Sequence, residues 1–305
     1  MDSWNIHISN GEFIQANSNM KIDVIVPIYK EVDEVKSLYC SLLEQKDVEI
    51  NKIIFPFTLS NESVDDELRA FIKENRIVSF EIPLEKFSHS LTREKAIREY
   101  AECDVVLLMS QDVKLVDEHS IYNLVKEVNN EVVYVFGKQI CTNKSIEKYI
   151  RKKNYPETSY VVSKEDIEAK QLMAFFASDA FSALNRKVFI DIGGYQGYDI
   201  MMGEDMLYSK FVLDHGYKKK YVAEAVVEHS HKYTLKQLYD RYYETGKFHK
   251  QVGLFENYKS TDSGMKLALY VLKEALKHFD IPVLFRWLPD MTSRYLGMKK
   301  GKKAK

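Results

Sequence analysis

The sequence has little of what marks secreted, membrane-spanning or nucleic-acid-binding proteins. It has only three cysteines, Cys40, Cys103 and Cys141, and their odd number and wide separation argue against a disulfide framework and a zinc knuckle. Long apolar runs are also missing, because runs such as Val105 to Met109 fall far short of the ~20 residues that span a bilayer. The 44 Lys and Arg balance 45 Asp and Glu, which gives no reason to expect nucleic acid as a partner.

The composition that is present is that of a folded, enzyme-sized protein. Apolar residues make up 45% of the 305 positions and charged residues 29%. This length suffices for one large domain or for a core domain with an appended helical part. The first twenty residues are mostly polar and lack the apolar segment of a secretory signal. We therefore expect a cytoplasmic enzyme.

Short β-branched runs separated by helix-length segments dominate the first half of the chain. The strand candidates are the segments 22–28, 52–55, 77–82, 104–109 and 132–136. Strands that alternate with helices predict βαβ units, and therefore an α/β fold with a mainly parallel sheet. The run 105–109 is apolar throughout, as expected of a central strand that is buried on both faces.

The second half of the chain has a different pattern. Residues from about 139 to 172 show little regular periodicity, and a strand-like segment follows at 217–227. Apolar spacing then predicts helices near 234–251, 264–279 and 283–296. Five of the last seven residues are lysines, which form a local block of positive charge.

Candidate metal ligands stand at two predicted strand ends. Asp112 follows the strand 104–109, and ligands of open α/β sheets bind beyond the carboxyl ends of strands, although a capping role suits its position equally well. His229 and His231 follow the segment 217–227, and residues separated by one position point to the same side of an extended chain. These oxygen and nitrogen ligands suit Mn²⁺ or Mg²⁺ better than Zn²⁺, because no cysteine is spaced to join them.

Glu204 and Asp205 form a second group of carboxylates. They follow Gly203 and a glycine-rich stretch, and they are predicted to open a helix. Acidic residues in a first helical turn commonly stabilise the helix dipole, so position alone assigns them no chemistry.

Five motifs follow one another along residues 21–251. They are Ile25-Val26-Pro27-Ile28-Tyr29-Lys30, His89-Ser90-Leu91-Thr92-Arg93-Glu94-Lys95-Ala96, Ser110-Gln111-Asp112, Ile192-Gly193-Gly194-Tyr195 with Gly203-Glu204-Asp205, and Val227-Glu228-His229-Ser230-His231-Lys232-Tyr233 with Arg241-Tyr242-Tyr243-Glu244-Thr245-Gly246. In this order they resemble glycosyltransferase family 2, and in detail its bacterial rhamnosyltransferase-like branch. The third motif is similar to that branch's T-Q-D form of the metal-binding motif, and the last to its H-S-H-x-Y…R-Y-F-x-x-G block.

The resemblance implies the GT-A fold, a Rossmann-like, mainly parallel sheet flanked by helices. It divides residues 21–251 into a nucleotide-binding half, about 21–113, and an acceptor half, 114–251. A polar leader, 1–20, and a C-terminal helical extension with a basic tail, 252–305, complete the organisation that we expect.

The resemblance also implies a reaction. This is the inverting, metal-dependent transfer of a sugar, with dTDP-L-rhamnose the favoured donor, to a glycan or a polyprenyl-linked saccharide in bacterial surface polysaccharide synthesis. Asp112 with His229 or His231 would hold Mn²⁺ or Mg²⁺. Asp205 would act as the general base, and Glu204 would orient it or bind acceptor hydroxyls.

Binding residues are carried over from the matching motifs. Those expected at the donor are Pro27, Tyr29, Glu31, Ser60, Arg93, Gln111 and Asp112. Those expected at the acceptor are Gly194, Tyr195 and Glu204. Ser60 stands where the family usually has an Asp that contacts the base, so the base of the donor stays open.

Two other functions remain open at this point. A sugar nucleotidyltransferase would need a glycine-rich phosphate loop after the first strand, and residues 27–31 contain no glycine. A non-catalytic sugar-nucleotide- or glycan-binding relative would explain the missing acids at Ser60 and Ser110. The C-terminal helices and the lysines of residues 299–305 suit a peripheral contact with the anionic inner face of the cell membrane, and a solvated tail suits them equally well.

Overall fold

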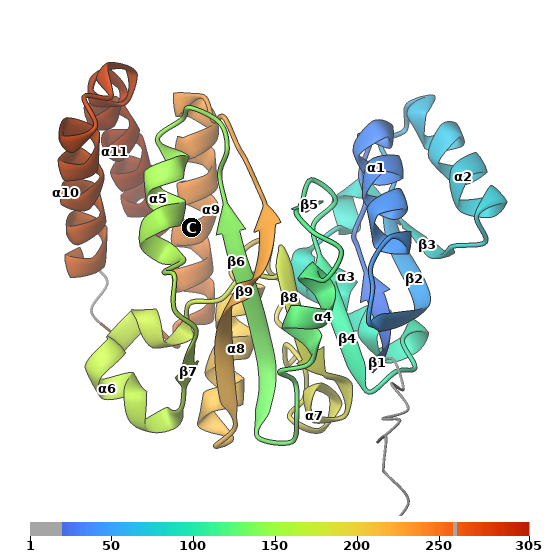
Figure 1. Ribbon diagram of the computed structural model, residues 1–305. Coiled ribbons are helices and arrows are strands. Elements are labelled where there is room, and N and C mark those ends of the chain that lie inside the picture. Colours follow the sequence, from blue (N-terminus) through green and yellow to red (C-terminus); the bar gives the residue numbers. More distant parts are fainter. Residues whose placement is uncertain (1–19, 259–260, 305) are drawn as a thin grey trace, which may run out of the picture.

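A nine-stranded sheet forms the centre of the structure, a computed structural model that describes residues 20–258 and 261–304 (Figure 1). The strands are β1 (Met20–Ile25), β2 (Val48–Thr58), β3 (Val78–Ile82), β4 (Val105–Met109), β5 (Lys114–Leu115), β6 (Val132–Ile140), β7 (Tyr160–Val162), β8 (Phe181–Asn185) and β9 (Lys218–Glu228). Their order across the sheet is β3-β2-β1-β4-β8-β6-β9-β5, and β7 also pairs with β9.

Parallel pairing joins β3, β2, β1 and β4 in one half of the sheet and β6 to β9 in the other. β8 runs antiparallel between β4 and β6 and thereby connects the two halves. The short strands β5 and β7 pair antiparallel with β9. The predicted α/β class with a helix-flanked sheet is confirmed, and antiparallel partners are added to it.

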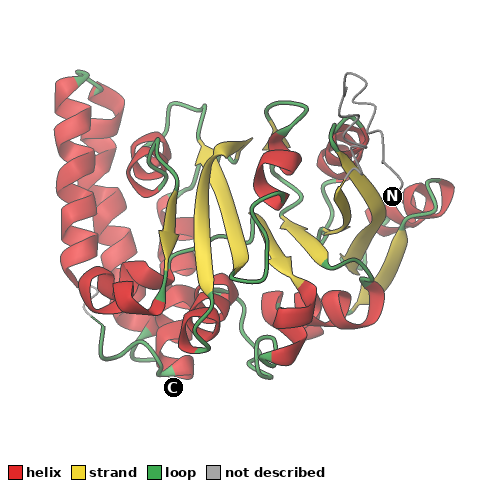
Figure 2. Cartoon of the chain, turned by 60° about the horizontal axis from the view of Figure 1, so that its bottom comes forward, coloured by secondary structure: helices red, strands yellow, loops and turns green. Residues whose placement is uncertain are grey.

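Helices cover both faces of the sheet (Figure 2). Their bounds are α1 (Val32–Leu43), α2 (Val64–Glu74), α3 (His89–Lys95), α4 (Ser120–Val125), α5 (Glu147–Asn154), α6 (Ile167–Lys170), α7 (Arg186–Asp191), α8 (Glu204–Asp214), α9 (Leu235–Val252), α10 (Thr261–Lys277) and α11 (Ile281–Gly301). Apolar residues of α1, α2 and α4 belong to one core cluster, and those of α7 and α8 belong to a second. β4 is buried between helices of both groups, which explains its continuous apolar sequence.

The segment 139–172 is more regular than its sequence suggests. It contains α5 and β7, where no periodic pattern was expected. Most of the eight residues of α5 are charged or polar, and only Glu147, Tyr149 and Ile150 are buried, so the apolar stripe is too narrow to be recognised in the sequence. β8 was not predicted either, because four of its five residues are buried and they show no strict alternation of polar and apolar side chains.

The last helix is longer than expected and packs along α9. It ends at Gly301 rather than near residue 296, so Lys299 and Lys300 belong to its last turn and not to a free tail. A Cβ atom at Gly297 or Gly301 would lie 2.3 or 2.0 Å from a backbone oxygen of α9, so glycine permits this close approach. Lys305 lies outside the described residues. Within the described chain, no helix has the length and apolar character needed to cross a bilayer.

Candidate active site

A cavity of about 540 Å³ opens where β4 and β9 end. The segment after β4 contributes Asp112, and the segment after β9 contributes His229 and His231. The first turn of α8 contributes Glu204 and Asp205, and further walls come from α5, α9 and α11. The carboxyl edge of the sheet thus brings together three groups of residues that are far apart in the sequence.

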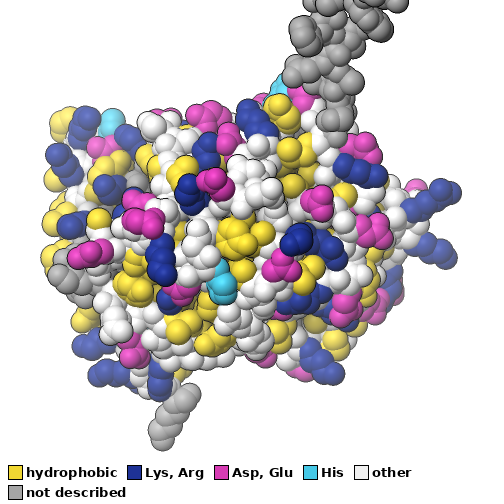
Figure 3. All heavy atoms as spheres, turned by 90° about the horizontal axis from the view of Figure 1, so that it is seen from below, with side chains coloured by type: hydrophobic (Ala, Val, Ile, Leu, Met, Phe, Trp, Pro, Cys, Tyr) yellow, Lys and Arg dark blue, Asp and Glu magenta, His cyan; other side chains and the backbone are white. Residues whose placement is uncertain are grey.

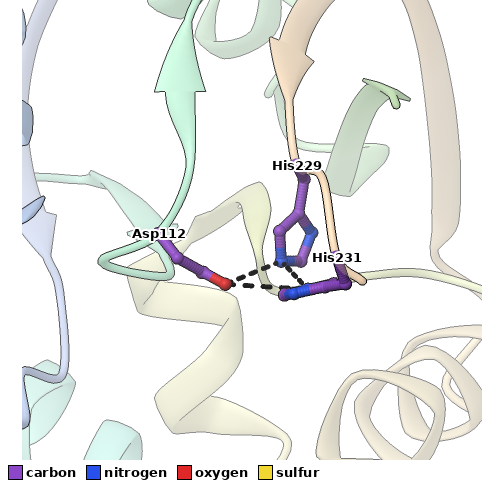
Figure 4. Close-up of side chains that lie close together, drawn as sticks. All are labelled: Asp112, His229 and His231. Carbon is purple, nitrogen blue, oxygen red and sulfur yellow. Dashed lines mark hydrogen bonds and ion pairs between the residues drawn. The ribbon is translucent and has the colours of Figure 1, made fainter. Parts of the chain in front are cut away.

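Asp112, His229 and His231 form a compact cluster of possible metal ligands (Figure 4). Asp112 Oδ2 lies 3.4 Å from His229 Nε2 and 3.6 Å from His231 Nε2. The two Nε2 atoms are 2.7 Å apart, and one ligand atom from each residue lies within 4.8 Å of the others. Two imidazole nitrogens at this distance need a proton or a cation between them, because their lone pairs otherwise repel each other.

Gln139 of β6 orients the imidazole ring of His229 through its Nδ1 atom. Its Oε1 lies 2.8 Å from His229 Nδ1 and also accepts a hydrogen bond of 2.5 Å from Arg151 Nη1. A carbonyl oxygen only accepts, so this shorter contact favours the His229 tautomer with its proton on Nδ1 and its Nε2 lone pair facing the cluster, over the longer contact of 3.4 Å from Arg151 Nη2 to the same Nδ1. His231 stacks on the Tyr233 ring at 4.9 Å. The ligand geometry is therefore prepared by neighbouring side chains.

The protonation states of the cluster also suit a cation. Burial works to raise the pKa of Asp112, but its interactions with His229 and His231 outweigh that effect and lower the pKa to about 2. Burial lowers the pKa of His229, and burial together with His229 lowers the pKa of His231 to about 4. Near neutral pH the cluster thus offers one carboxylate and two neutral imidazoles, the forms that bind metals.

Glu204 is held in a buried ion pair. It accepts a hydrogen bond from Arg93 of α3, and both side chains are less than 10% exposed. A second Arg93 nitrogen lies 3.3 Å from the backbone oxygen of Asp179. Arg93 Nη1 also lies 3.2 Å from His89 Nδ1, and burial lowers the pKa of His89 to about 3. Arg93 therefore anchors the acidic side of the cavity instead of standing free for a ligand.

Asp179 is a third carboxylate on this side of the cavity, which sequence reasoning missed. It is buried and accepts hydrogen bonds from Tyr134 Oη at 2.6 Å, Ser182 Oγ at 2.6 Å and Tyr195 Oη at 3.2 Å. Its position in an irregular loop carries no sequence signal, because its three side-chain partners come from β6, β8 and the loop after α7.

Asp205 differs from its two acidic neighbours. Among the described residues, its carboxylate makes no ion pair and accepts a hydrogen bond only from the Met206 backbone N–H, at 2.6 Å. Burial and the negative charges of Glu204 and Asp179 raise the pKa of Asp205 well above its usual value. An unpaired carboxylate with a raised pKa that faces a cavity has the properties of a general base.

The residues expected at the donor base lie outside the lining of this cavity. Gln111 uses both ends of its amide on the backbone of Tyr29, at 2.7 and 2.9 Å, and so fastens the end of β4 to the end of β1. Ser60 donates a hydrogen bond of 2.6 Å to Asp65, which also accepts the backbone N–H groups of residues 60 and 61. Pro27 is half-buried and Glu31 is exposed near these strand ends. Asp65 thus places a carboxylate beside position 60.

Gly194 and Tyr195 do not line the cavity, in contrast to the predicted acceptor contacts. Tyr195 is fully buried, its hydroxyl bonds Asp179, and its backbone N–H donates to Glu94 at 3.0 Å. Gly194 has a positive φ of 60°, and a Cβ there would collide with Glu94. Tyr195 thus positions the buried Asp179, and Gly194 is itself buried beside it.

Two solved structures share this architecture. A mannosyltransferase from Pyrobaculum calidifontis, PcManGT, solved in complex with GDP-Man and Mn²⁺, has a TM-score of 0.53 and 13% identity, covering 92% of this chain and 73% of that chain. A mycobacterial protein of known crystal structure has a TM-score of 0.52 and 14% identity, covering 79% and 78%. The protein therefore has the GT-A fold, as the motifs implied.

Sequence comparison then decides the family. Residues 23–193 match the family model for glycosyl transferase family 2, and the chain belongs to that family. The O-antigen chain rhamnosyltransferase RfbN of Salmonella typhimurium is 33% identical over 75% of this chain and 73% of its own length. The O-antigen chain rhamnosyltransferase WbaN of Salmonella anatum is 34% identical over 54% of this chain and 53% of its own. The protein is a glycosyltransferase, which decides against the nucleotidyltransferase and the non-catalytic alternatives.

Proposed function

We propose that this glycosyltransferase transfers L-rhamnose from dTDP-rhamnose to a glycan or polyprenyl-linked saccharide during synthesis of a bacterial surface polysaccharide. The similarity to two O-antigen chain rhamnosyltransferases supports the sugar and the type of product. The observation that carries the reaction is the single cavity that joins the Asp112, His229 and His231 cluster to Asp205. A donor diphosphate and an acceptor hydroxyl each find a suitable partner there.

Asp112, His229 and His231 fit a divalent cation, Mn²⁺ or Mg²⁺, which when bound supplies positive charge for the donor diphosphate. Arg151 and Arg241 also face the cavity, and neither forms an ion pair with a carboxylate in the described part of the chain. The Arg151 Nε is buried without a hydrogen-bond partner there. The charge of neither guanidinium group is paired with a carboxylate, so both attract phosphate oxygens.

Asp205 takes the proton of the acceptor hydroxyl. Its raised pKa makes it a stronger base than an ordinary aspartate, and no cation has to be displaced before it reacts. Glu204 cannot share this role while it balances the buried charge of Arg93, so we assign it to positioning. With one base and no enzyme nucleophile, a single in-line displacement inverts the anomeric centre.

One wall of the cavity suits a saccharide acceptor. Apolar and aromatic side chains from Ile150, Tyr155 and Phe176 line it, together with the polar pair Glu147 and Arg294. Sugar rings present both apolar faces and hydroxyl groups, so a mixed wall of this kind matches their chemistry.

The direct test measures release of nucleoside diphosphate from dTDP-rhamnose, UDP-glucose and GDP-mannose, with a lipid-linked saccharide extract as acceptor. We expect acceptor-dependent release from dTDP-rhamnose that stops in EDTA and returns with Mn²⁺ or Mg²⁺. Asp112→Asn should lose the metal response, whereas Asp33→Asn, an exposed acid on α1, should keep it. A preference for another nucleotide sugar would defeat the donor assignment, and turnover unaffected by EDTA would defeat the metal.

A further inference from the structure

Large apolar side chains are concentrated on the outside of the two C-terminal helices. Of the seventeen large apolar residues that are exposed in the described chain, nine lie between Met265 and Leu296. They are Met265, Leu269, Leu276, Phe279, Ile281, Phe285, Leu288, Tyr295 and Leu296. Phe279 and Phe285 are the most exposed, at 84% and 82%. We call these nine residues the outer face of the α10–α11 hairpin.

The outer face follows helical periodicity. Ile281, Phe285 and Leu288 recur at intervals of four and three residues, so they share one side of α11. The opposite side already packs inward, with Val283 buried in an apolar cluster with residues of α5 and α10 and Gly297 against α9. A helix that faced only water on its outer side would present polar residues there, and these helices present apolar ones.

The charges around the outer face are positive. Five exposed lysines have no carboxylate within ion-pair distance in the described residues: Lys266, Lys273, Lys277, Lys299 and Lys300. The described acids of the hairpin are instead neutralised by the protein itself, since Glu274 pairs with Lys152, Asp280 with Lys148 and Asp290 with Arg294. Figure 3 shows hydrophobic and basic side chains side by side along the left edge, the side of α10 and α11 in Figure 1.

The hairpin is firmly joined to the cavity wall. At its turn, Asp280 bonds Lys148 and also accepts a hydrogen bond of 3.1 Å from the Tyr149 hydroxyl of α5. Arg286 donates a hydrogen bond of 2.7 Å to the backbone oxygen of Tyr233, two residues beyond His231. The turn also lies on the side of the molecule where β6 and β9 end (Figure 1). Whatever binds the outer face is therefore held in a fixed orientation to the cavity.

We propose that the outer face of the α10–α11 hairpin binds the surface of a bilayer that contains anionic lipids. Phe279 and Phe285 enter the boundary between headgroups and acyl chains, and the unpaired lysines contact the anionic headgroups. We choose a lipid surface as the binding partner because it combines an apolar interior with negatively charged headgroups. This contact uses a folded helical face, in place of the free lysine tail expected from the sequence, and it does not depend on which sugar is transferred.

Flotation of the full chain with vesicles tests the proposal. We expect binding to phosphatidylethanolamine vesicles that contain phosphatidylglycerol, weak binding to phosphatidylcholine vesicles, and weakening when NaCl rises from about 0.1 to about 0.5 M. Phe279→Ser with Phe285→Ser should reduce partitioning by about tenfold or more. The matched control, Leu43→Ser with Leu84→Ser, removes two exposed apolar residues elsewhere and should bind as the unaltered protein does.

Two further measurements distinguish a loss of membrane binding from other effects of the substitutions. Transfer to a water-soluble acceptor should be unchanged in the phenylalanine variant, which separates lost membrane binding from misfolding and from failure of the proposed function. Lys266→Gln with Lys273→Gln should weaken binding to anionic vesicles without touching the apolar stripe. Equal flotation of all variants overturns the proposal. So does a dimer in sedimentation that the phenylalanine variant dissociates, with no vesicle binding, because the outer face then joins two copies of the chain.

Discussion

At the scale of single residues, the two adjacent carboxylates in the first turn of α8 have different roles. Glu204 is buried and balances the charge of Arg93, whereas Asp205 faces the cavity without a cationic partner. The Arg93 guanidinium is itself buried, so its partner is needed for folding. We therefore assign proton transfer to Asp205 and a stabilising role to Glu204, although the two side chains are nearly the same.

Two variants, Asp205→Asn and Glu204→Gln, should separate these roles. Asp205→Asn keeps the shape and removes the basicity, so we expect kcat to fall by about 10²-fold or more with donor affinity nearly unchanged. Glu204→Gln leaves Arg93 uncompensated in a buried site, so we expect a loss of about 3–5 kcal/mol in stability. Steady-state kinetics and thermal unfolding measure the two effects. Asp214→Asn at the exposed end of the same helix is the control, and normal turnover in Asp205→Asn would place the base elsewhere.

The raised pKa of Asp205 also predicts how stability depends on pH. An aspartate whose pKa is higher in the folded state than in the unfolded state binds more protons when folded. It therefore destabilises the protein increasingly as the pH rises from its ordinary pKa, about 4, to the raised folded value. Asp205→Asn should raise the unfolding midpoint near pH 7 and change it little below about pH 4. A variant that is less stable than the parent at neutral pH would contradict the raised pKa.

The site residues that the sequence could predict are those placed by strand ends. Asp112, His229 and His231 follow apolar strands directly, and the cluster forms because those ends meet at one edge of the sheet. Gln139 and Asp179 were not predictable in this way. Their roles depend on partners brought close only by the fold, such as His229, which is 90 positions from Gln139.

At the scale of elements, the parallel half of the sheet was predictable because its strands are continuous apolar runs between helices. β2 and β6 proved longer than their predicted cores, since their ends carry charged residues that the pattern excludes. α5 escaped prediction for a related reason. Its lysines are not a solvated face but partners of the C-terminal helices, Lys148 of Asp280 and Lys152 of Glu274.

The close packing of α11 on α9 requires glycine at the contact, and this requirement can be tested. A Cβ at Gly301 would lie 2.0 Å from the backbone oxygen of Tyr243, so Gly301→Ala must push the helices apart. We expect a loss of about 1–3 kcal/mol in denaturant unfolding. Gly264→Ala in α10 is the control, because its added Cβ meets nothing within 4 Å and alanine favours a helix. Equal stability of the two variants would show that the α9–α11 contact adapts freely.

At the scale of the whole molecule, the cavity is lined in part by α11, a helix that the sequence suggested was an appendage. Arg294 of α11 lines it, pairs with Asp290 at 2.6 Å and with Glu147 of α5, and donates to the Tyr242 hydroxyl of α9 at 2.8 Å. One guanidinium thereby holds three helices around the wall of the cavity that we assign to the acceptor. The boundary proposed near residue 251 thus separates segments that build one site.

Arg294→Met tests whether this wall of the cavity serves the acceptor. The change leaves Glu147 and Asp290 without their shared cation, so we expect a loss of about 3–5 kcal/mol in stability. In the protein that remains folded, KM for the acceptor should rise while donor affinity stays nearly constant, because Asp112 and the histidines belong to other elements. Arg294→Lys should be more stable than Arg294→Met, because lysine keeps the positive charge but lacks the planar guanidinium group. Lys73→Met on α2, an exposed position, controls for the loss of a positive charge. Weakened donor binding with an unchanged KM for the acceptor would reverse the orientation of the two substrates, since the helices α5, α9 and α11 would then surround the nucleotide sugar.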